Sequence, residues 1–257
     1  MRNTYLSNEL SNVRVHYLDT VSSTNDVAKK CALAGEEEGL VIVAENQTHG
    51  KGRWGRRWQS PKGGLWFTIL LRPPSLEHLG LISLAAGIAS VRTIECFGVS
   101  VNLKWPNDII FDGRKLGGIL IEGGTQGDSY YALVGIGINL NIPKDAFSED
   151  VRETATSLLE LTSCIIPKDS FLNTLLGHFF KLYKSILSGQ TNNLLEEYRR
   201  ACSSIGKKVR VETLQGTIDG TVVGIAHDGA LLLDICEGLT RKIQCGEVTS
   251  LRGRTVA

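Results

Sequence analysis

The sequence predicts an α+β protein, with a mixed, mostly antiparallel sheet that carries packed helices, followed by a small C-terminal β-barrel. Three observations support this fold class. Before residue 204, runs rich in β-branched and aromatic residues alternate with runs of helical periodicity. Short turns such as Asp112-Gly113 join consecutive strand runs, and turns of this length connect antiparallel strands. After residue 204, short strand runs follow one another with no helix between them.

The first part of the chain holds the strands and helices of a larger unit. Gly, Pro, Asn or Asp bound each strand run, and these residues favour turns. We expect Ser75 to cap the second helix, because a serine hydroxyl can accept from free N–H groups at a helix start. The expected strands are Val13–Leu18, Gly39–Ala44, Leu65–Leu71, Val101–Lys104, Asp108–Phe111, Lys115–Glu122 and Tyr130–Leu140, and the expected helices are Asn25–Ala34, Leu76–Phe97, Ser170–Leu187 and Asn193–Cys202.

The last part of the chain forms a second, smaller unit. The expected boundary divides residues 1–204 from residues 205–257. A unit this small buries little apolar surface by itself, so we expect it to dock on the larger one. Its expected strands are Lys207–Glu212, Gly216–Ile225, Ala230–Ile235 and Thr240–Gln244.

Composition excludes several classes of protein. The formal net charge of +1 argues against a protein that binds nucleic acid over its whole surface. None of the six cysteines lies in a CxxC pair, so neither a zinc site nor a dithiol motif is indicated, and no metal ligands are expected. The segment from Met1 to Leu10 lacks the apolar run of a signal peptide, and no apolar segment is long enough to cross a bilayer. We therefore expect a cytoplasmic protein.

The positive charge of the chain is concentrated in one glycine-rich segment, which runs from His49 to Trp58. It holds Lys51, Arg53, Arg56 and Arg57 and no acidic residue, a local charge of +4 that leaves −3 for the remainder. Glycines let a backbone approach an anion closely, and arginine offers forked donors to phosphate. The segment also separates two apolar strands, and a loop this long between strands is usually functional. A nucleic-acid-binding hairpin is the alternative interpretation.

Four further segments carry candidate site residues. Lys104 ends an apolar strand just before Trp105-Pro106-Asn107-Asp108, which fixes its ammonium near a turn. Paired glycines in Lys115–Glu122 indicate a bulge or a closely approaching ligand. The glycines of Val134–Asn139 alternate, so they share one strand face and leave either a groove or room for a crossing helix. The segment Ser22–Asn25 precedes a helix and is a good N-cap cluster.

Taken in this order, the segments resemble the biotin–protein ligase family from about Val13 to Arg252. That resemblance implies a catalytic α+β domain with an SH3-like C-terminal barrel, and it implies catalytic roles for Lys104 and Arg53. The biotin-binding residues it implies are Ser23, Thr24, Asn25, Gln47, Lys51, Gly52, Arg53, Lys104 and Gly117. The residues it implies for ATP and the adenylate are Gly50, Lys51, Gly52, Arg53, Trp54, Arg56, Asn107, Lys115 and Asn139.

The resemblance also implies an activity and its partners. The substrates would be biotin and ATP with Mg²⁺, and the biotinyl group would pass to a lysine of a biotin carboxyl carrier domain. The family commonly has arginine where Lys51 stands, and many members carry an N-terminal DNA-binding domain. Few residues precede the first expected strand here, so the ligase-only form without specific DNA binding is expected. A lipoate ligase is the nearest alternative function, and a homodimer paired through a sheet edge is possible on physical grounds.

Overall fold

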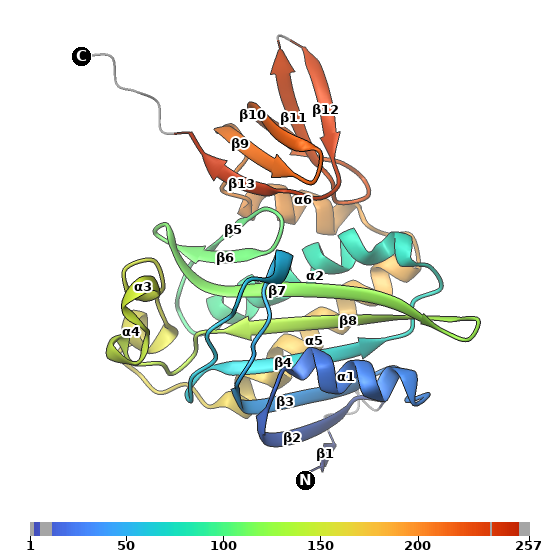
Figure 1. Cartoon of the computed structure of the whole chain (residues 1–257), viewed down its shortest axis with the longest axis vertical. Coiled ribbons are helices and arrows are strands. Elements are labelled where there is room, and N and C mark those ends of the chain that lie inside the picture. Colours follow the sequence, from blue (N-terminus) through green and yellow to red (C-terminus); the bar gives the residue numbers. More distant parts are fainter. Residues whose placement is uncertain (1–2, 6–11, 237, 252–257) are drawn as a thin grey trace.

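The computed structural model describes residues 3–5, 12–236 and 238–251, and the segment from Met1 to Leu10 lies outside this part except for residues 3–5. Eight strands form the large sheet in the order β1-β2-β3-β4-β8-β7-β6-β5 (Figure 1). Only β2 and β3 pair in parallel, so the sheet is mixed and mostly antiparallel, as predicted. The strands are β1 Asn3–Tyr5, β2 Arg14–Val21, β3 Leu40–Gln47, β4 Leu65–Leu71, β5 Asn102–Lys104, β6 Asp108–Phe111, β7 Arg114–Gln126 and β8 Ser129–Ile138.

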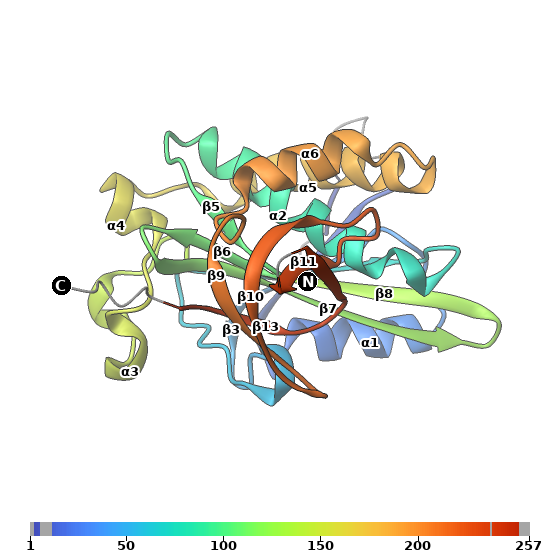
Figure 2. The same cartoon turned by 90° about the horizontal axis from the view of Figure 1, so that it is seen from above.

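Helices lie on both faces of this sheet. Figure 2 shows α2, α5 and α6 on one side and α1 on the other. Helix α1, as the crossover between the parallel strands β2 and β3, has its N-terminus next to the C-terminal ends of both strands. The longer helices are α1 Thr24–Leu33, α2 Leu79–Glu95, α5 Lys168–Leu187 and α6 Asn192–Ala201.

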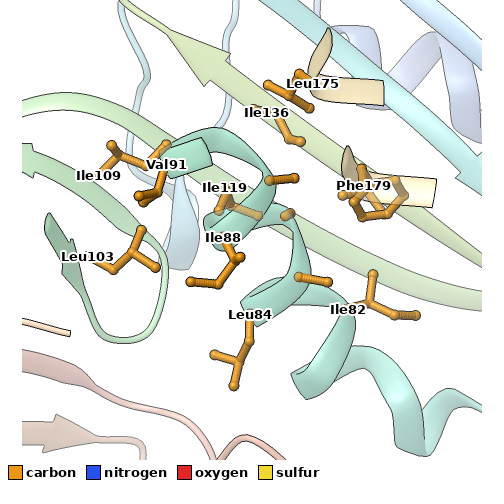
Figure 3. Close-up of a cluster of buried hydrophobic side chains, with 14 of the residues drawn as sticks. Ile82, Leu84, Ile88, Val91, Leu103, Ile109, Ile119, Ile136, Leu175 and Phe179 are labelled. Atoms are coloured by element: carbon orange, nitrogen blue, oxygen red, sulfur yellow. The ribbon is translucent and has the colours of Figure 1, made fainter. Parts of the chain in front are cut away.

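The main core lies between α2, α5 and the sheet. Ile82 and Ile88 of α2 meet Ile119 and Ile136 of the sheet and Phe179 of α5 (Figure 3), and all five side chains are at most 3% exposed. A smaller cluster under α1 fills the opposite face. Burial on both faces explains why Leu65–Leu71 is apolar at every position except Thr68 and does not alternate.

The C-terminal unit is a five-stranded antiparallel sheet of SH3-like type, in the order β12-β11-β10-β9-β13. It docks on the larger unit, where the indole nitrogen of Trp105 donates to the carbonyl of Gly229 at 3.1 Å. Close packing is visible at Gly80, where an added Cβ would lie 2.5 Å from the carbonyl oxygen of Asp228. The strands are β9 Lys208–Thr213, β10 Gly216–Ile225, β11 Leu231–Cys236, β12 Leu239–Ile243 and β13 Glu247–Ser250.

The structure differs from the sequence expectations at short elements. The second expected helix is divided into the 3₁₀ turn η3 (Leu76–His78) and α2, although Ser75 caps its start by accepting from the backbone N–H of Glu77, as predicted. Strands β1 and β13 and helices α3 (Glu149–Arg152) and α4 (Leu158–Thr162) were not predicted. Such elements, at five residues or fewer, are too short to show a period. Within the described residues, no helix has the length and apolarity that crossing a membrane requires.

Candidate functional site

A cavity opens beside the start of α1, above β7 and β8. The glycine-rich loop between β3 and β4 covers it, and the turn between β5 and β6 and the start of β13 complete its wall. Predicted site residues from the start of α1, the end of β3, the glycine-rich loop, the turn after β5 and the start of β7 meet here, although Ser23 and Lys115 are 92 positions apart in the chain. The predicted residues that line the cavity are Ser23, Thr24, Asn25, Gln47, Lys51, Gly52, Arg53, Arg56, Lys104, Asn107 and Lys115.

One end of the cavity is polar and rigid. Ser23, Thr24 and Asn25 are at most 3% exposed, at the N-terminus of α1. Gln47 Oε1 accepts from the backbone N–H of Thr24 at 2.8 Å, and Gln47 Nε2 donates to Ser60 Oγ at 2.8 Å. Because both ends of the Gln47 amide are occupied, its orientation is fixed. This end therefore presents hydrogen-bonding groups in defined positions.

The alternating glycines of β8 form part of the cavity wall. A Cβ added at Gly135 would lie 2.3 Å from Asn25 Oδ1, and one at Gly137 would lie 2.9 Å from the indole nitrogen of Trp58. Of the two sequence interpretations, the close approach of a helix is found at Gly135, whereas the Trp58 ring fills the space at Gly137, where a groove was the alternative. Gly135 makes room for helix α1, and Gly137 makes room for an aromatic ring.

Trp58 lies inside the cavity and was not among the predicted site residues. Its ring packs edge-on against Trp66, with the ring centroids 6.3 Å apart, and Lys115 Nζ lies 5.1 Å from its centroid. Its indole N–H is buried and has no hydrogen-bond partner among the described residues. An unpaired buried donor is costly, and here the indole nitrogen packs against Gly137 of β8. Trp54, which sequence reasoning selected, is 43% exposed and lines only the adjoining hollow under the loop, with Gly50.

The cations of the loop are held from two sides. Lys51 pairs with Asp26 of α1, and Arg56 pairs with Glu247 of β13. The hydrogen bond from Lys51 to Asp26 raises the pKa of the lysine, so its positive charge is retained. Arg53 donates to the carbonyl of Gly246 at 2.9 Å and to Cys245 Sγ at 3.1 Å. The loop therefore bridges the two structural units, an arrangement that no sequence signal indicated.

Lys104 lies at the other end of the cavity. Its turn is fixed to β7, because Asn107 Nδ2 donates to the carbonyl of Ile119 at 2.9 Å and the N–H of Ile119 donates to the carbonyl of Asn107 at 2.9 Å. Lys115 forms a 2.6 Å ion pair with Asp108, whereas Lys104 forms no ion pair within the part of the chain that the structure describes. The ammonium of Lys104 is thus available to an anion in the cavity.

Besides Gly50 and Trp54, two further predicted residues do not line the cavity. Asn139 is 4% exposed and donates to the carbonyl of Thr156 at 2.9 Å and that of Lys115 at 3.3 Å, so it braces the start of β7. Gly117 lies inside the sheet, where an added Cβ would be 2.8 Å from the carbonyl oxygen of Gly137. Asn139 and Gly117 therefore both support β7, the strand that carries Lys115.

Comparison with known proteins agrees with this geometry. Residues 17–139 match the model of the biotin/lipoate A/B protein ligase family, and residues 204–249 match the biotin protein ligase C-terminal domain. The bifunctional ligase/repressor BirA of Bacillus spizizenii is 34% identical over 247 residues, which cover 95% of this chain and 76% of that protein. The chain belongs to the biotin/lipoate A/B protein ligase family.

Other relatives extend over most of the family fold. The biotin--[acetyl-CoA-carboxylase] ligase of Mycobacterium tuberculosis is 33% identical, and the alignment covers 91% of this chain and 89% of that one. Among solved structures, the biotin protein ligase of Aquifex aeolicus in complex with biotin and ATP superposes with a TM-score of 0.79 at 29% identity. That match covers 93% of this chain and 98% of the Aquifex chain, so family membership extends through both structural units.

Proposed function

We propose that the protein is a biotin–protein ligase, which activates biotin with MgATP to biotinyl-5′-adenylate and transfers the biotinyl group to a lysine of a biotin carboxyl carrier domain. The observation that carries the proposal is the polarity of the cavity. One end offers neutral hydrogen-bonding groups on Thr24, Asn25 and Gln47, and the other offers the cations Lys104 and Lys115. An acid with a polar, uncharged head group matches both ends.

Biotin would lie along the cavity with its ring system at the α1 end. Ser23, Thr24, Asn25 and Gln47 would bind the ring system, and the biotin carboxylate would reach Lys104. Lys51, Gly52 and Arg53 of the loop would close over the biotin. Gly117 does not line the cavity and would support the site through its packing inside the sheet. This orientation follows from charge, because a carboxylate is stabilised beside ammonium groups and not beside Glu122 at the α1 end.

The nucleotide would occupy the side of the cavity nearer to Trp58 and Lys115. The Trp58 ring lines this side of the cavity and offers an aromatic surface for an adenine to stack on. Arg53 and Arg56 would bind phosphate with forked donors. Mg²⁺ would arrive with ATP, because it prefers phosphate oxygens and water as ligands.

In the first step, a carboxylate oxygen of biotin attacks the α-phosphorus of ATP, and pyrophosphate leaves. Two anions must approach each other, so a fixed cation between them lowers the barrier. Lys104 has the position and the chemistry for this role. In the second step, the neutral acceptor amine attacks the acyl carbon, and the bond between this carbon and the AMP oxygen breaks. AMP leaves with the bonding electrons, and the amine nitrogen loses a proton to solvent as the amide forms.

A direct experiment tests the proposal. The protein is incubated with MgATP and either biotin or lipoate, and pyrophosphate release and the acid adenylate are measured. We expect pyrophosphate and biotinyl-adenylate with biotin, and biotinylation of a carboxyl carrier domain when it is added. Adenylate formation with lipoate alone would replace this function with that of a lipoate ligase.

The assembly of two copies is a second proposal. Beyond β5, the backbone N–H of Ser203 donates to the carbonyl of Leu103 at 2.8 Å, so that edge of the large sheet is covered. The opposite edge ends at β1. We propose that two copies of the protein pair through a sheet edge, and that this edge is β1. Sedimentation velocity over a range of concentrations measures it, and a strictly monomeric protein would contradict it.

A further inference from the structure

A buried hydroxyl behind the polar end of the cavity has no role in the proposed function. Thr68 of β4 is fully buried, and its Oγ1 lies 2.8 Å from Thr24 Oγ1 and 2.6 Å from Asn25 Oδ1. On the far side of Asn25, its amide nitrogen donates to Glu122 Oε2 of β7 at 2.6 Å. Thr24, Thr68, Asn25 and Glu122 therefore form a continuous hydrogen-bonded row across α1, β4 and β7.

The protons in this row can point in only one direction. A carboxylate accepts hydrogen bonds, so Asn25 presents its NH₂ to Glu122 and its oxygen to Thr68. The amide oxygen cannot donate, so the single proton of Thr68 lies on the 2.6 Å contact with Asn25. The 2.8 Å contact between the two threonines must then use the proton of Thr24.

We infer that Thr68 and Glu122 are positioning residues, which fix Thr24 as a hydrogen-bond acceptor toward the substrate head group. Thr24 gives its proton to Thr68 at 2.8 Å, in preference to Gln47 Oε1 at 3.2 Å. Thr24 and Gln47 both line the cavity. The lone pairs that remain on Thr24 Oγ1 and Gln47 Oε1 are therefore the acceptors that this wall offers to a ligand. This wall therefore selects a head group that carries N–H donors.

The inference rests on the proposed function and deepens it, because it concerns the choice between acid substrates. The cyclic urea of biotin carries two N–H groups, whereas the dithiolane of lipoate carries none. A site built from fixed acceptors binds a donor strongly and leaves those acceptors unpaired with a ligand that lacks one. Gly135 is part of the same device, since an added Cβ would displace the Asn25 oxygen that orients the row.

Thr68→Val is the central test, because it removes the hydroxyl and keeps the side-chain shape. By titration calorimetry we expect the Kd for biotin to rise about tenfold or more, since the proton of Thr24 is then free to point elsewhere and the Asn25 oxygen loses its partner. The KM for ATP in pyrophosphate release should stay within about twofold. Thr68→Ser, which keeps the hydroxyl, should restore the Kd for biotin to within about threefold of the wild-type value.

Thr93→Val is the matched control. Thr93 is also fully buried, and its hydroxyl donates to the carbonyl of Ala89 within α2, away from the cavity. The Thr93→Val variant should have a lower melting temperature and an unchanged affinity for biotin. For Glu122, the alanine variant should weaken biotin binding more than Glu122→Gln, because glutamine keeps an oxygen that can accept from Asn25.

Three results would overturn the inference. They are an unchanged Kd for biotin in Thr68→Val, an equal rise in the KM for ATP, and an equal loss of biotin affinity in Thr93→Val. Each would reduce Thr68 to a scaffold residue while leaving the ligase function intact. A wild-type protein that binds no biotin would instead remove the proposed function, so the two failures can be told apart.

Discussion

Among single residues, Lys104 is the one to which the proposed mechanism assigns the most direct part in adenylate formation. It ends β5 at a turn fixed to β7, and its ammonium is not neutralised by a carboxylate of the described chain. We expect Lys104→Gln to slow pyrophosphate release about 10²-fold or more, as loss of one preorganised transition-state donor does. Transfer from preformed biotinyl-adenylate should fall less, because phosphate is then the leaving group. A folded variant with near wild-type release would remove Lys104 from the mechanism.

Replacement of Arg53 should reduce the affinity for the adenylate more than the affinity for biotin. Arg53 lines the cavity and its guanidinium is anchored on the carbonyl of Gly246 of the C-terminal unit, and the proposed function assigns it to the phosphate. We expect Arg53→Ala to weaken adenylate binding by about 1.5–3 kcal/mol, the range for a charge-assisted hydrogen bond. Biotin affinity, measured in parallel by calorimetry, should change less. Equal losses for both ligands would assign Arg53 a general structural role.

The predictability of individual residues depended on whether they belong to a motif. Lys104 and Lys115 were selected from their segments and Gln47 from the family resemblance, and the structure brings the three together in one cavity. Thr68 and Glu247 were missed because a threonine in an apolar strand and a glutamate in a short one are unremarkable in sequence. Their importance comes only from neighbours distant in the chain, at Asn25 and Arg56.

At the scale of elements, the backbone amides of the loop from residue 47 to residue 60 should become more protected from hydrogen exchange when ligand binds. Of its four cations, Lys51 and Arg56 are paired with Asp26 and Glu247, so self-repulsion is partly relieved without an anion. Both pairs are partly exposed, and pairs of this kind contribute little stability. We expect amide hydrogen exchange over residues 47–60 to slow when biotin and MgATP are added. Equally high protection in both states would show that the loop does not close on ligand.

Strands and helices were predictable where they are long enough to show a pattern. The runs Leu65–Leu71 and Asp108–Phe111 have the predicted bounds. Asp112 and Gly113 form the turn between β6 and β7, with φ values of +46° and +76°. The order of strands was not predictable, since the pairing of β4 with β8 joins segments that are more than fifty residues apart. Pairing between such distant segments leaves no local mark in the sequence.

At the scale of the whole molecule, Trp105 should hold the two structural units together. Its indole donates to the carbonyl of Gly229 inside the interface, and the side chain is 2% exposed. We expect Trp105→Phe to lower the free energy of unfolding by about 1–3 kcal/mol, the cost of a buried acceptor without a partner. Trp66→Phe is the control, because its indole bonds to Pro61 within the larger unit.

The two variants should differ in where hydrogen exchange increases. Trp105→Phe should speed exchange in β9 to β13, whereas Trp66→Phe should leave the barrel protected. Docking of the C-terminal unit was expected from its size, but the residues that dock it were not, because Trp105 was interpreted through its motif alone. Similar acceleration of barrel exchange in both variants would contradict this assignment.

The cavity wall includes Glu247 and Val248 of the barrel as well as residues of the larger sheet. A ligand that fills it therefore binds only the docked arrangement, and its binding energy is added to the cohesion of the two units. At a ligand concentration one hundred times Kd, this linkage is worth about 2.7 kcal/mol. Bound biotinyl-adenylate would thus stabilise the docked arrangement of the two units. Without ligand, we expect a calorimetric scan to show separate melting transitions for the barrel and the larger sheet. With the adenylate bound, we expect one cooperative transition.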